Sequence, residues 1–144
     1  MSPATAVASA AAKALPQTSR AFDVTFACDP ACVGRARRIT RAFLGLWNVN
    51  GELAENILLA VSELVTNAIE HGTGDVALRL WYPHGELRIE VTDDNPAPAE
   101  LRLAGDDDVS GRGLFLVAVL ARTWGVSKDG KTTWCMFRIP EGRG

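Results

Sequence analysis

Three polar residues recur at intervals of four in the segment Ser62–Gly72, namely Glu63, Asn67 and His71. Because residues four apart are neighbours on a helix, this spacing predicts one stripe that carries a carboxylate, an amide and an imidazole. Such a row suits a general base, a metal ligand and a phosphate contact. The apolar residues of this stretch and of the segment just before it fall on the other side and predict a core-facing surface: Ile57, Ala60, Val61, Leu64 and Ala68. An ordinary amphipathic helix with a solvated polar face is the alternative.

Two further motifs follow in a fixed order, Val-Thr-Asp-Asp-Asn-Pro at 91–96 and Gly-Arg-Gly-Leu at 111–114. Together with Glu-x-x-x-Asn-Ala-x-x-His, they resemble the N box and the two glycine boxes of the ATPase superfamily that unites DNA gyrase, Hsp-type chaperones, histidine kinases and mismatch-repair ATPases. Within it, the chain most resembles the small bacterial branch of anti-sigma-factor serine/threonine kinases, especially stand-alone regulatory ATP-binding proteins of actinobacteria. The resemblance covers roughly residues 20 to 140.

The resemblance implies a metal-binding role for Asn67 and a catalytic role for Glu63. Magnesium takes few protein oxygens, so one amide oxygen can suffice when phosphates supply other ligands. Asn67 fits that role, and the implied cofactors are ATP and Mg²⁺. A phosphoryl-transfer enzyme also needs a carboxylate that orients or deprotonates the attacking hydroxyl, and Glu63 lies one helical turn before Asn67. A solvated carboxylate and a tolerated surface amide are the alternatives.

Asp93 stands at the end of a predicted strand, where its carboxylate can accept the exocyclic amine of adenine. In the family pattern this aspartate begins Asp-x-Gly-x-Gly, whereas here Asn95, Pro96 and Ala97 occupy the following positions. The departure argues against tight adenine binding. Asn95 stays a candidate contact because asparagine tolerates unusual backbone angles nearly as glycine does. A turn before Pro96 is the alternative role of the aspartate.

Gly111 and Gly113 allow backbone amides to approach phosphate groups. Leu114 opens a predicted helix whose positive N-terminal end favours the same anion. Arg112 lies between the glycines, where it either reaches the γ-phosphate or is simply solvated. A loop-to-helix junction without a ligand would have the same pattern.

The resemblance implies two more contacts. Thr132, on the last predicted strand, matches a threonine that assists adenine recognition, and Thr133 is the alternative if the register shifts by one. His71 closes the helix at a position where the anti-sigma branch also carries histidine. Capping of the helix C-terminus is the other role open to it.

Length, composition and net charge limit the classes of protein to which this chain can belong. The 144 residues suit one domain, with 47% hydrophobic and 22% charged residues. A net charge of -2 and a pI near 5.7 leave no basic field for nucleic acid, so no direct nucleic-acid binding is expected. Cys28, Cys32 and Cys135 match neither a disulfide framework nor a zinc site. No secretory signal or membrane span is recognised, so we expect a cytoplasmic protein without a membrane partner.

The periodicity divides the chain into a disordered tail over 1–20 and one domain over 21–141. The expected elements are a strand at 21–27, a helix that starts at Asp29-Pro30 and runs to 46, a helix at 52–71, an antiparallel hairpin of 76–82 and 87–91, a mobile lid at 94–112, a helix at 114–124 and final strands near 126 and at 133–139. These elements predict an α/β fold, a two-layer sandwich of a mainly antiparallel sheet and helices. The family that the chain resembles, with its histidine-kinase-like ATPase fold, has the same architecture.

The first helix has two kinds of residue at helical spacing. Its apolar set predicts a core-facing side: Val33, Ala36, Ile39, Phe43 and Leu46. Its arginines make it the best candidate for meeting an acidic partner, with plain solvation as the alternative: Arg35, Arg37, Arg38 and Arg41.

The resemblance implies an ATP-binding anti-sigma-type regulator. It would be a protein serine/threonine kinase that sequesters a sigma factor and phosphorylates a serine of an anti-sigma-factor antagonist protein. We expect it to work as a homodimer. The competing hypothesis is a non-catalytic interaction protein that keeps the fold with weak or no ATP binding, which the missing glycines after Asp93 favour.

Overall fold

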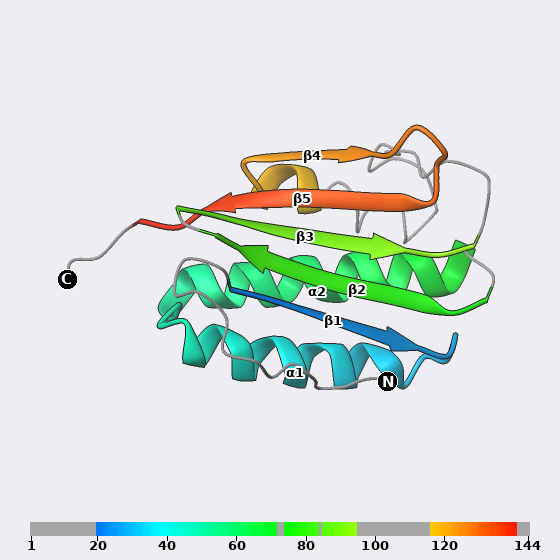
Figure 1. The fold of residues 1–144 in the computed structure, drawn as a ribbon, viewed down its shortest axis with the longest axis horizontal. Helices are drawn as coiled ribbons and strands as arrows, with labels where there is room; N and C mark the ends of the chain where they lie inside the picture. Colours follow the sequence, from blue (N-terminus) through cyan, green and yellow to red (C-terminus); the bar gives the residue numbers. More distant parts are fainter. Residues whose placement is uncertain (1–19, 72–73, 84, 95–115, 141–144) are drawn as a thin grey trace.

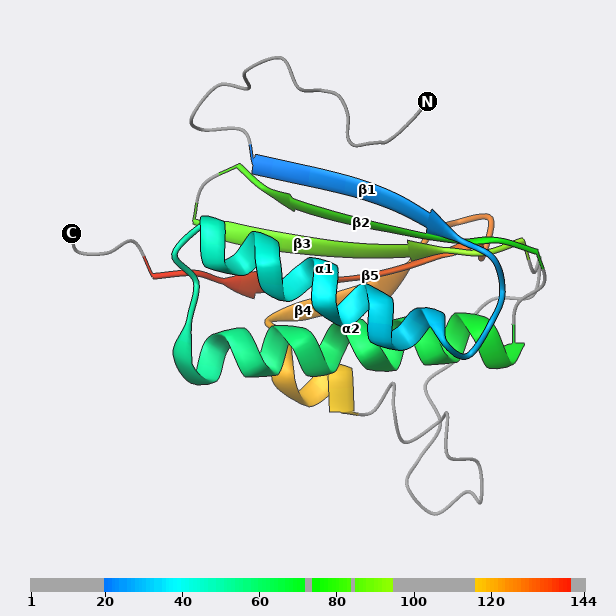
Figure 2. The ribbon, with the colours of Figure 1, turned by 90° about the horizontal axis from the view of Figure 1, so that it is seen from below.

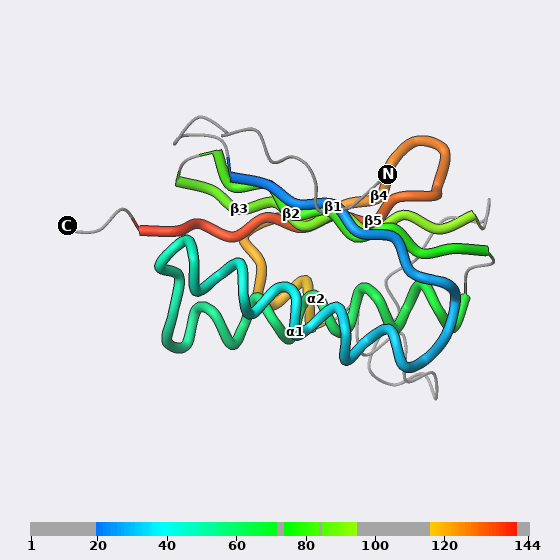
Figure 3. Tube along the Cα trace, turned by 60° about the horizontal axis from the view of Figure 1, so that its bottom comes forward, coloured from blue at the N-terminus to red at the C-terminus, as the bar shows by residue number. Residues whose placement is uncertain are grey.

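The computed structural model describes residues 20–71, 74–83, 85–94 and 116–140. Within these ranges, five strands form one sheet in the order β1-β2-β3-β5-β4, and all neighbouring strands are antiparallel. The elements are β1 (Arg20–Phe26), α1 (Cys32–Leu46), α2 (Gly51–His71), β2 (Val76–Tyr82), β3 (Glu86–Thr92), β4 (Thr123–Val126) and β5 (Thr132–Arg138). Both long helices cover the same face of the sheet (Figures 1 and 3), which confirms the predicted two-layer α/β sandwich and its hairpin.

The apolar side of α2 forms the centre of the core, as its periodicity predicts. All five residues that were expected there have exposed fractions of at most 2%. Leu58 and Val65 are buried too, because α2 packs against α1 as well as against β2 and β3. The opposing wall consists of alternate residues of the sheet, among them Leu78, Leu80 and Ile89, which are fully buried. The core therefore fixes the rotation of α2 about its axis, and with it the direction of the polar stripe.

The packing of α1 differs from the expectation in one respect. Its buried residues recur every four positions: Cys32, Ala36, Thr40 and Leu44. Leu46, which was expected on the core side, is 74% exposed, so that part of the prediction is wrong. The sheet is reached instead by Phe43, whose ring stacks on Phe22 of β1 at a centroid distance of 4.6 Å. Leu46 is the last residue of the helix, and the residue after it, Trp47, makes the contact with the sheet there, since its ring lies 5.9 Å from that of Tyr82 on β2.

The start of α1 also differs from the prediction. Asp29 Oδ1 accepts a hydrogen bond from the backbone N–H of Ala31 at 2.9 Å, and Asp29 O accepts one from the N–H of Cys32. The helix begins at Cys32, and its N-cap Ala31 makes no side-chain capping bond. Asp29 and Pro30 therefore form a turn ahead of the helix and do not serve as its N-cap and first-turn proline.

The predicted helix at 114–124 is wrong at its C-terminal end. In the part of this segment that the structure describes, the helix covers 116–120 and β4 begins at Thr123. Trp124 pairs with Cys135 in the β4–β5 ladder. Threonine, tryptophan and valine suit a pleated strand, and β5 offers an edge with which they can pair. Pairing with β5 therefore overrides the apolar spacing that suggested a longer helix.

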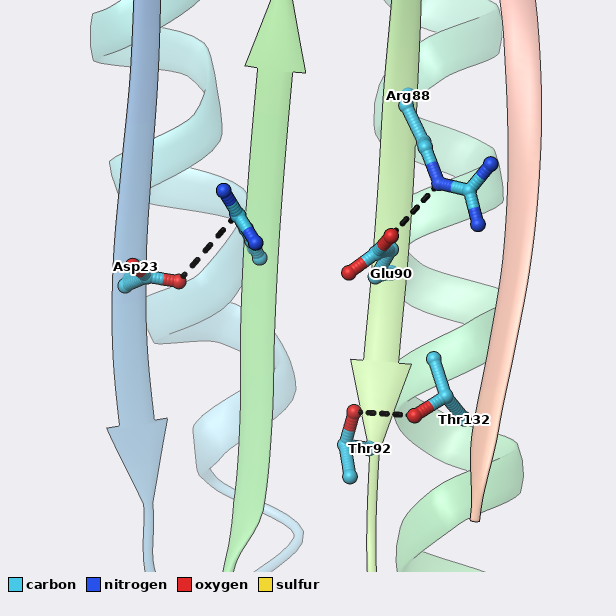
Figure 4. A network of polar contacts seen from close by, with 6 residues as sticks. Asp23, Arg88, Glu90, Thr92 and Thr132 are labelled. Carbon is cyan, nitrogen blue, oxygen red and sulfur yellow. Dashed lines mark hydrogen bonds and ion pairs between the residues drawn. The ribbon is translucent and has the colours of Figure 1, made fainter. Parts of the chain in front are cut away.

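The face of the sheet that is turned away from the helices is called the open face here. It presents the alternate residues Asp23, Arg79, Trp81, Glu86, Arg88, Glu90, Thr92, Thr132, Trp134, Met136 and Arg138. Arg88 Nε donates to Glu90 Oε2 at 2.6 Å (Figure 4), and the Arg88 guanidinium lies 4.4 Å from the Trp134 ring centroid. An added Cβ on Gly125 would lie 2.7 Å from Trp134 Cζ2, so the indole lies directly on the backbone of β4. The open face is thus a polar and aromatic layer that no described helix covers.

Among the described helices, none is both long enough and apolar enough to cross a membrane. The predicted tail over 1–20 falls almost entirely outside the described residues, and β1 begins at Arg20, one residue earlier than expected.

Candidate functional site

The C-terminal half of α2 carries the predicted polar row. Glu63 and Asn67 are half-buried and His71, in the last turn, is exposed. The three residues share one stripe because they are four apart on a regular helix. The C-terminal end of α2, the end of β3 and the start of β5 lie at the same end of the sandwich (Figures 1 and 2). The fold therefore brings the α2 row next to the strand that leads into Asp93.

Asp93 follows the last residue of β3 and continues its pairing with β5. Its backbone N–H donates to Lys131 O at 2.9 Å, which extends the β3–β5 register by one residue. Val91 is buried towards the helices and Thr92 points to the open face, so by alternation Asp93 returns to the helix side. This places its carboxylate on the same side of the sheet as Glu63 and Asn67.

Gly74, between α2 and β2, lies next to the residue that follows Asp93. It has φ of +73°, and a Cβ built there would overlap Asp94 Oδ2. The connection between α2 and β2 thus packs against the residue after Asp93. Because both the positive φ and the close approach exclude a side chain, glycine is needed at this position.

The two threonines of β5 lie on opposite faces of the sheet. Thr132 Oγ1 and Thr92 Oγ1 are 2.8 Å apart in a hydrogen bond on the open face, in front of the strands and away from the helices (Figure 4). Thr133 is 7% exposed and points towards the helix layer. A ligand held beside α2 is therefore on the same side of the sheet as the Thr133 side chain and on the opposite side from the Thr132 side chain. The geometry favours Thr133, the alternative that a shift of register by one residue had left open.

The remaining candidates lie outside the described residues: Asn95, Gly111, Arg112, Gly113, Leu114 and all but the first residue of the predicted lid. Their roles stay predictions.

Electrostatics distinguish Glu63 from an ordinary surface carboxylate. Burial raises the pKa of its carboxyl above the usual value, and the negative charge of Glu70 raises that pKa further. A carboxylate with a raised pKa holds a proton more readily at neutral pH, which suits a residue that accepts one from a hydroxyl. Perturbed carboxyls of this kind concentrate at functional sites, although packing alone can also produce them.

Ser62, immediately before Glu63, makes a contact that the sequence alone does not predict. Its Oγ accepts a hydrogen bond from Arg37 Nη1 at 2.7 Å and donates to Leu58 O at 3.0 Å. Ser62 is buried and Arg37 is half-buried, so this bond joins the arginine side of α1 to the helix that carries Glu63. A serine within an otherwise apolar helical face was the available signal, but its partner comes from another helix.

Asn67 fits the small role that a protein side chain has in a magnesium–nucleotide site. Its amide is half-buried and lies one turn from Glu63. Within the described ranges, no group of three or more His, Cys, Asp and Glu residues is arranged to hold a metal ion by itself. A cation at Asn67 would therefore take its other ligands from phosphates and water, as Mg²⁺ does in nucleotide complexes.

Comparison with known proteins identifies the family. Residues 26–137 match the histidine kinase-like ATPase domain. A Streptomyces coelicolor protein described as uncharacterized is 37% identical over 75 residues, which cover 49% of this chain and 71% of the relative. The matched range includes the α2 row, Asp93 and both threonines of β5. The chain belongs to the family of histidine kinase-like ATPase domains.

Proposed function

We propose that this protein binds Mg²⁺-ATP and acts as an anti-sigma-type regulator with protein serine/threonine kinase activity. The observation that carries the proposal is the shared location of Glu63, Asn67 and Asp93. Two of these residues are half-buried on one stripe of α2, and the third leaves β3 on the helix side at the same end of the sandwich. The family match supports the nucleotide part of this proposal.

In the proposed reaction, each residue of the chain has one task. Asn67 would hold the magnesium ion, which would supply positive charge to the phosphates, and Asp93 would accept a hydrogen bond from the exocyclic amine of adenine. Glu63 orients the attacking serine hydroxyl of the antagonist protein and accepts its proton. The raised pKa of Glu63 suits this step, because burial and Glu70 both favour its protonated form.

Calorimetry tests nucleotide binding directly. Asn67→Ala and Asp93→Ala should each weaken Mg²⁺-ATP binding by roughly 5- to 150-fold, since a lost polar contact costs about 1–3 kcal/mol. Glu52→Ala, an exposed substitution in the first turn of α2 and thus at the other end of that helix, is the control and should bind as the wild type does. If the wild type shows no magnesium-dependent binding at millimolar ATP, the site assignment fails.

The arginine side of α1 is the surface that we propose for the protein partner, a sigma factor or its antagonist. Helix α1 contains four arginines and no acidic residue, although the whole chain has a net charge of -2. Among the described residues, none of these four arginines makes an ion pair. An acidic segment of the partner would neutralise this charge. Arg37 is the most restrained of them, because Ser62 holds its guanidinium.

Pull-down with the sigma factors and antagonists encoded by the same genome tests this surface. Arg38→Glu and Arg41→Glu should abolish capture of the partner while Mg²⁺-ATP binding remains, because both side chains are exposed on α1. Capture that is unchanged in the double variant would place the partner elsewhere.

We further propose that a second copy covers the open face, which would make the protein a homodimer. Trp81 is 42% exposed there, and the charges of this face sum to zero, so two copies of it meet without net repulsion; the charged residues are Asp23, Arg79, Glu86, Arg88, Glu90 and Arg138. Light scattering at high micromolar protein decides between monomer and dimer. A strict monomer with and without partner rules the dimer out.

The competing function is a non-catalytic interaction protein with the same fold. The residues after Asp93 favour it, because Asn95, Pro96 and Ala97 replace the glycines of the family pattern. Capture of a sigma factor without ATP binding or phosphate transfer would establish this function instead.

A further inference from the structure

A cavity opens at the end of the sheet opposite to the candidate nucleotide site. Its volume is about 320 Å³, and its lining consists of Gly85, Glu86, Arg122, Arg138, Ile139 and Pro140. Glu86 begins β3, whereas Thr92 ends it beside Asp93. At about 3.4 Å per residue along a strand, roughly 20 Å separate the two places. The cavity is therefore distinct from the proposed ATP site and does not depend on that proposal.

Backbone hydrogen bonds hold the lining residues at fixed positions. The Arg122 N–H donates to Met136 O at 2.8 Å, which continues the β4–β5 ladder beyond the start of β4. The Ile139 N–H donates to Gly85 O at 2.9 Å, which continues the β3–β5 ladder beyond the end of β5. Both arginines thus project from backbone that is part of the sheet.

The charges around this cavity are not paired with one another. Arg122 and Arg138 are exposed, and neither makes an ion pair or a side-chain hydrogen bond within the part of the chain that the structure describes. The same holds for Glu86, although it is the cross-strand neighbour of Arg138. On the same sheet, by contrast, Arg88 bonds to a glutamate at 2.6 Å. Arg122, Arg138 and Glu86 therefore border one cavity, and within the described part of the chain no ion pair or side-chain hydrogen bond ties their charges to another protein group.

We propose that this cavity binds a free α-amino acid with an apolar side chain. Guanidinium groups form paired hydrogen bonds with a carboxylate, so Arg122 and Arg138 bind the α-carboxylate. Glu86 binds the α-ammonium group, and Pro140, which is exposed, contacts the side chain, whereas Ile139 is 6% exposed and supports the cavity from the core. The lining carries a net charge of +1. A dianion such as a phosphate ester would make the occupied cavity negative and would lie beside the Glu86 carboxylate, which repels it. The volume lies at the lower end of the range of small-molecule pockets.

Calorimetry on the full chain with L-leucine is the primary test, with two analogues that each lack one charged group. 4-Methylpentanoate lacks the ammonium group and isoamylamine lacks the carboxylate. Leucine should bind at least about tenfold more tightly than either analogue, because each charge-assisted contact contributes at least that factor. Equal binding of 4-methylpentanoate and leucine overturns the assignment of an amino acid.

Variants of the lining locate the site. Arg122→Ala and Arg138→Ala should each weaken leucine binding about tenfold or more, and the double variant should show none. Glu86→Gln should weaken leucine and leave 4-methylpentanoate unchanged. Lys128→Ala, which removes an exposed positive charge elsewhere, is the matched control. Thermal unfolding of each variant verifies the fold, and Arg122→Lys retains the charge if the alanine variant is unstable. Leucine binding that survives in the double variant, or no binding of leucine, valine or methionine at about 10 mM, overturns the proposal.

Discussion

Replacement of Glu63 by glutamine tests the catalytic reasoning most sharply, because the change preserves shape and removes one charge. The half-buried carboxylate lies one turn from Asn67, so we expect Glu63→Gln to bind Mg²⁺-ATP as the wild type does. Without the proton acceptor, transfer to the serine of the antagonist protein should fall by about 10²–10⁴-fold. This range corresponds to an increase of roughly 3–5 kcal/mol in the activation free energy.

The same substitution has a predicted effect on stability whose sign follows from the pKa. Burial, and then Glu70, raise the pKa of Glu63 in the folded protein above its unfolded value. The folded state therefore binds the proton more tightly, and this contribution to stability is complete below the unfolded pKa, about 4.3, and is lost as the pH rises through the folded pKa. At neutral pH the ionised carboxylate destabilises the fold. Glu63→Gln should thus unfold at a higher temperature than the wild type at about pH 7, and the difference should vanish near pH 4.

Two assays on the same protein preparations decide the matter. Transfer of labelled phosphate from ATP to the antagonist proteins gives the catalytic effect, and thermal unfolding at both pH values gives the stability effect. Glu55→Gln is the matched control, since Glu55 is an exposed carboxylate of the same helix. A Glu63→Gln variant that transfers phosphate at the wild-type rate would refute the catalytic role. A lower unfolding temperature at neutral pH would refute the electrostatic argument.

Three other predictions follow from local geometry. Asn67→Asp should change the magnesium dependence of ATP binding, because a carboxylate binds the cation more strongly than an amide does. Calorimetric titration at several Mg²⁺ concentrations measures this dependence, and an unchanged dependence would contradict the role of Asn67. Gly125→Ala should destabilise the protein by about 1–3 kcal/mol in urea unfolding, because its Cβ would lie 2.7 Å from Trp134 Cζ2; an unchanged midpoint would contradict this packing. Iodoacetamide should label Cys28, which is exposed, well before the two buried thiols, because burial also raises the pKa of Cys135 to about 12. Mass spectrometry follows the order of labelling, and early modification of Cys135 would contradict this prediction.

Local spacing was sufficient to predict much of this protein. The four-residue interval of the α2 row and the apolar residues between its members predict both the helix and its rotation, because a helix repeats every 3.6 residues whatever packs against it. Strand alternation in β2 and β3, with a Pro-His-Gly turn between them, predicts the hairpin for the same local reason. The two-layer architecture then follows from the need to bury one side of each element.

Local spacing was insufficient wherever a distant segment competes. The residues of β4 have helix-like apolar spacing, yet they pair with β5 across a short turn, and β5 itself is held by its pairing with β3, which lies far from it in the sequence. Leu46 matches the apolar repeat of α1, but whether it is covered depends on which strand residues face the end of that helix. The end of the helix before β4 and the exposure of Leu46 both depend on contacts between elements, and local periodicity gives no information on these contacts.

The sequence by itself determined which residue types form the candidate site and on which elements they lie. Only the tertiary structure decided on which face of the sheet each strand residue lies. Thr132 and Thr133 are equivalent in sequence, but the β3–β5 register bonds Thr132 to Thr92 on the open face and buries Thr133 towards α2. The bond between Arg37 and Ser62 likewise exists because two helices meet at one place. Side-chain direction in a strand alternates with every residue, so a register set by distant pairing partners determines which residues can reach a common ligand.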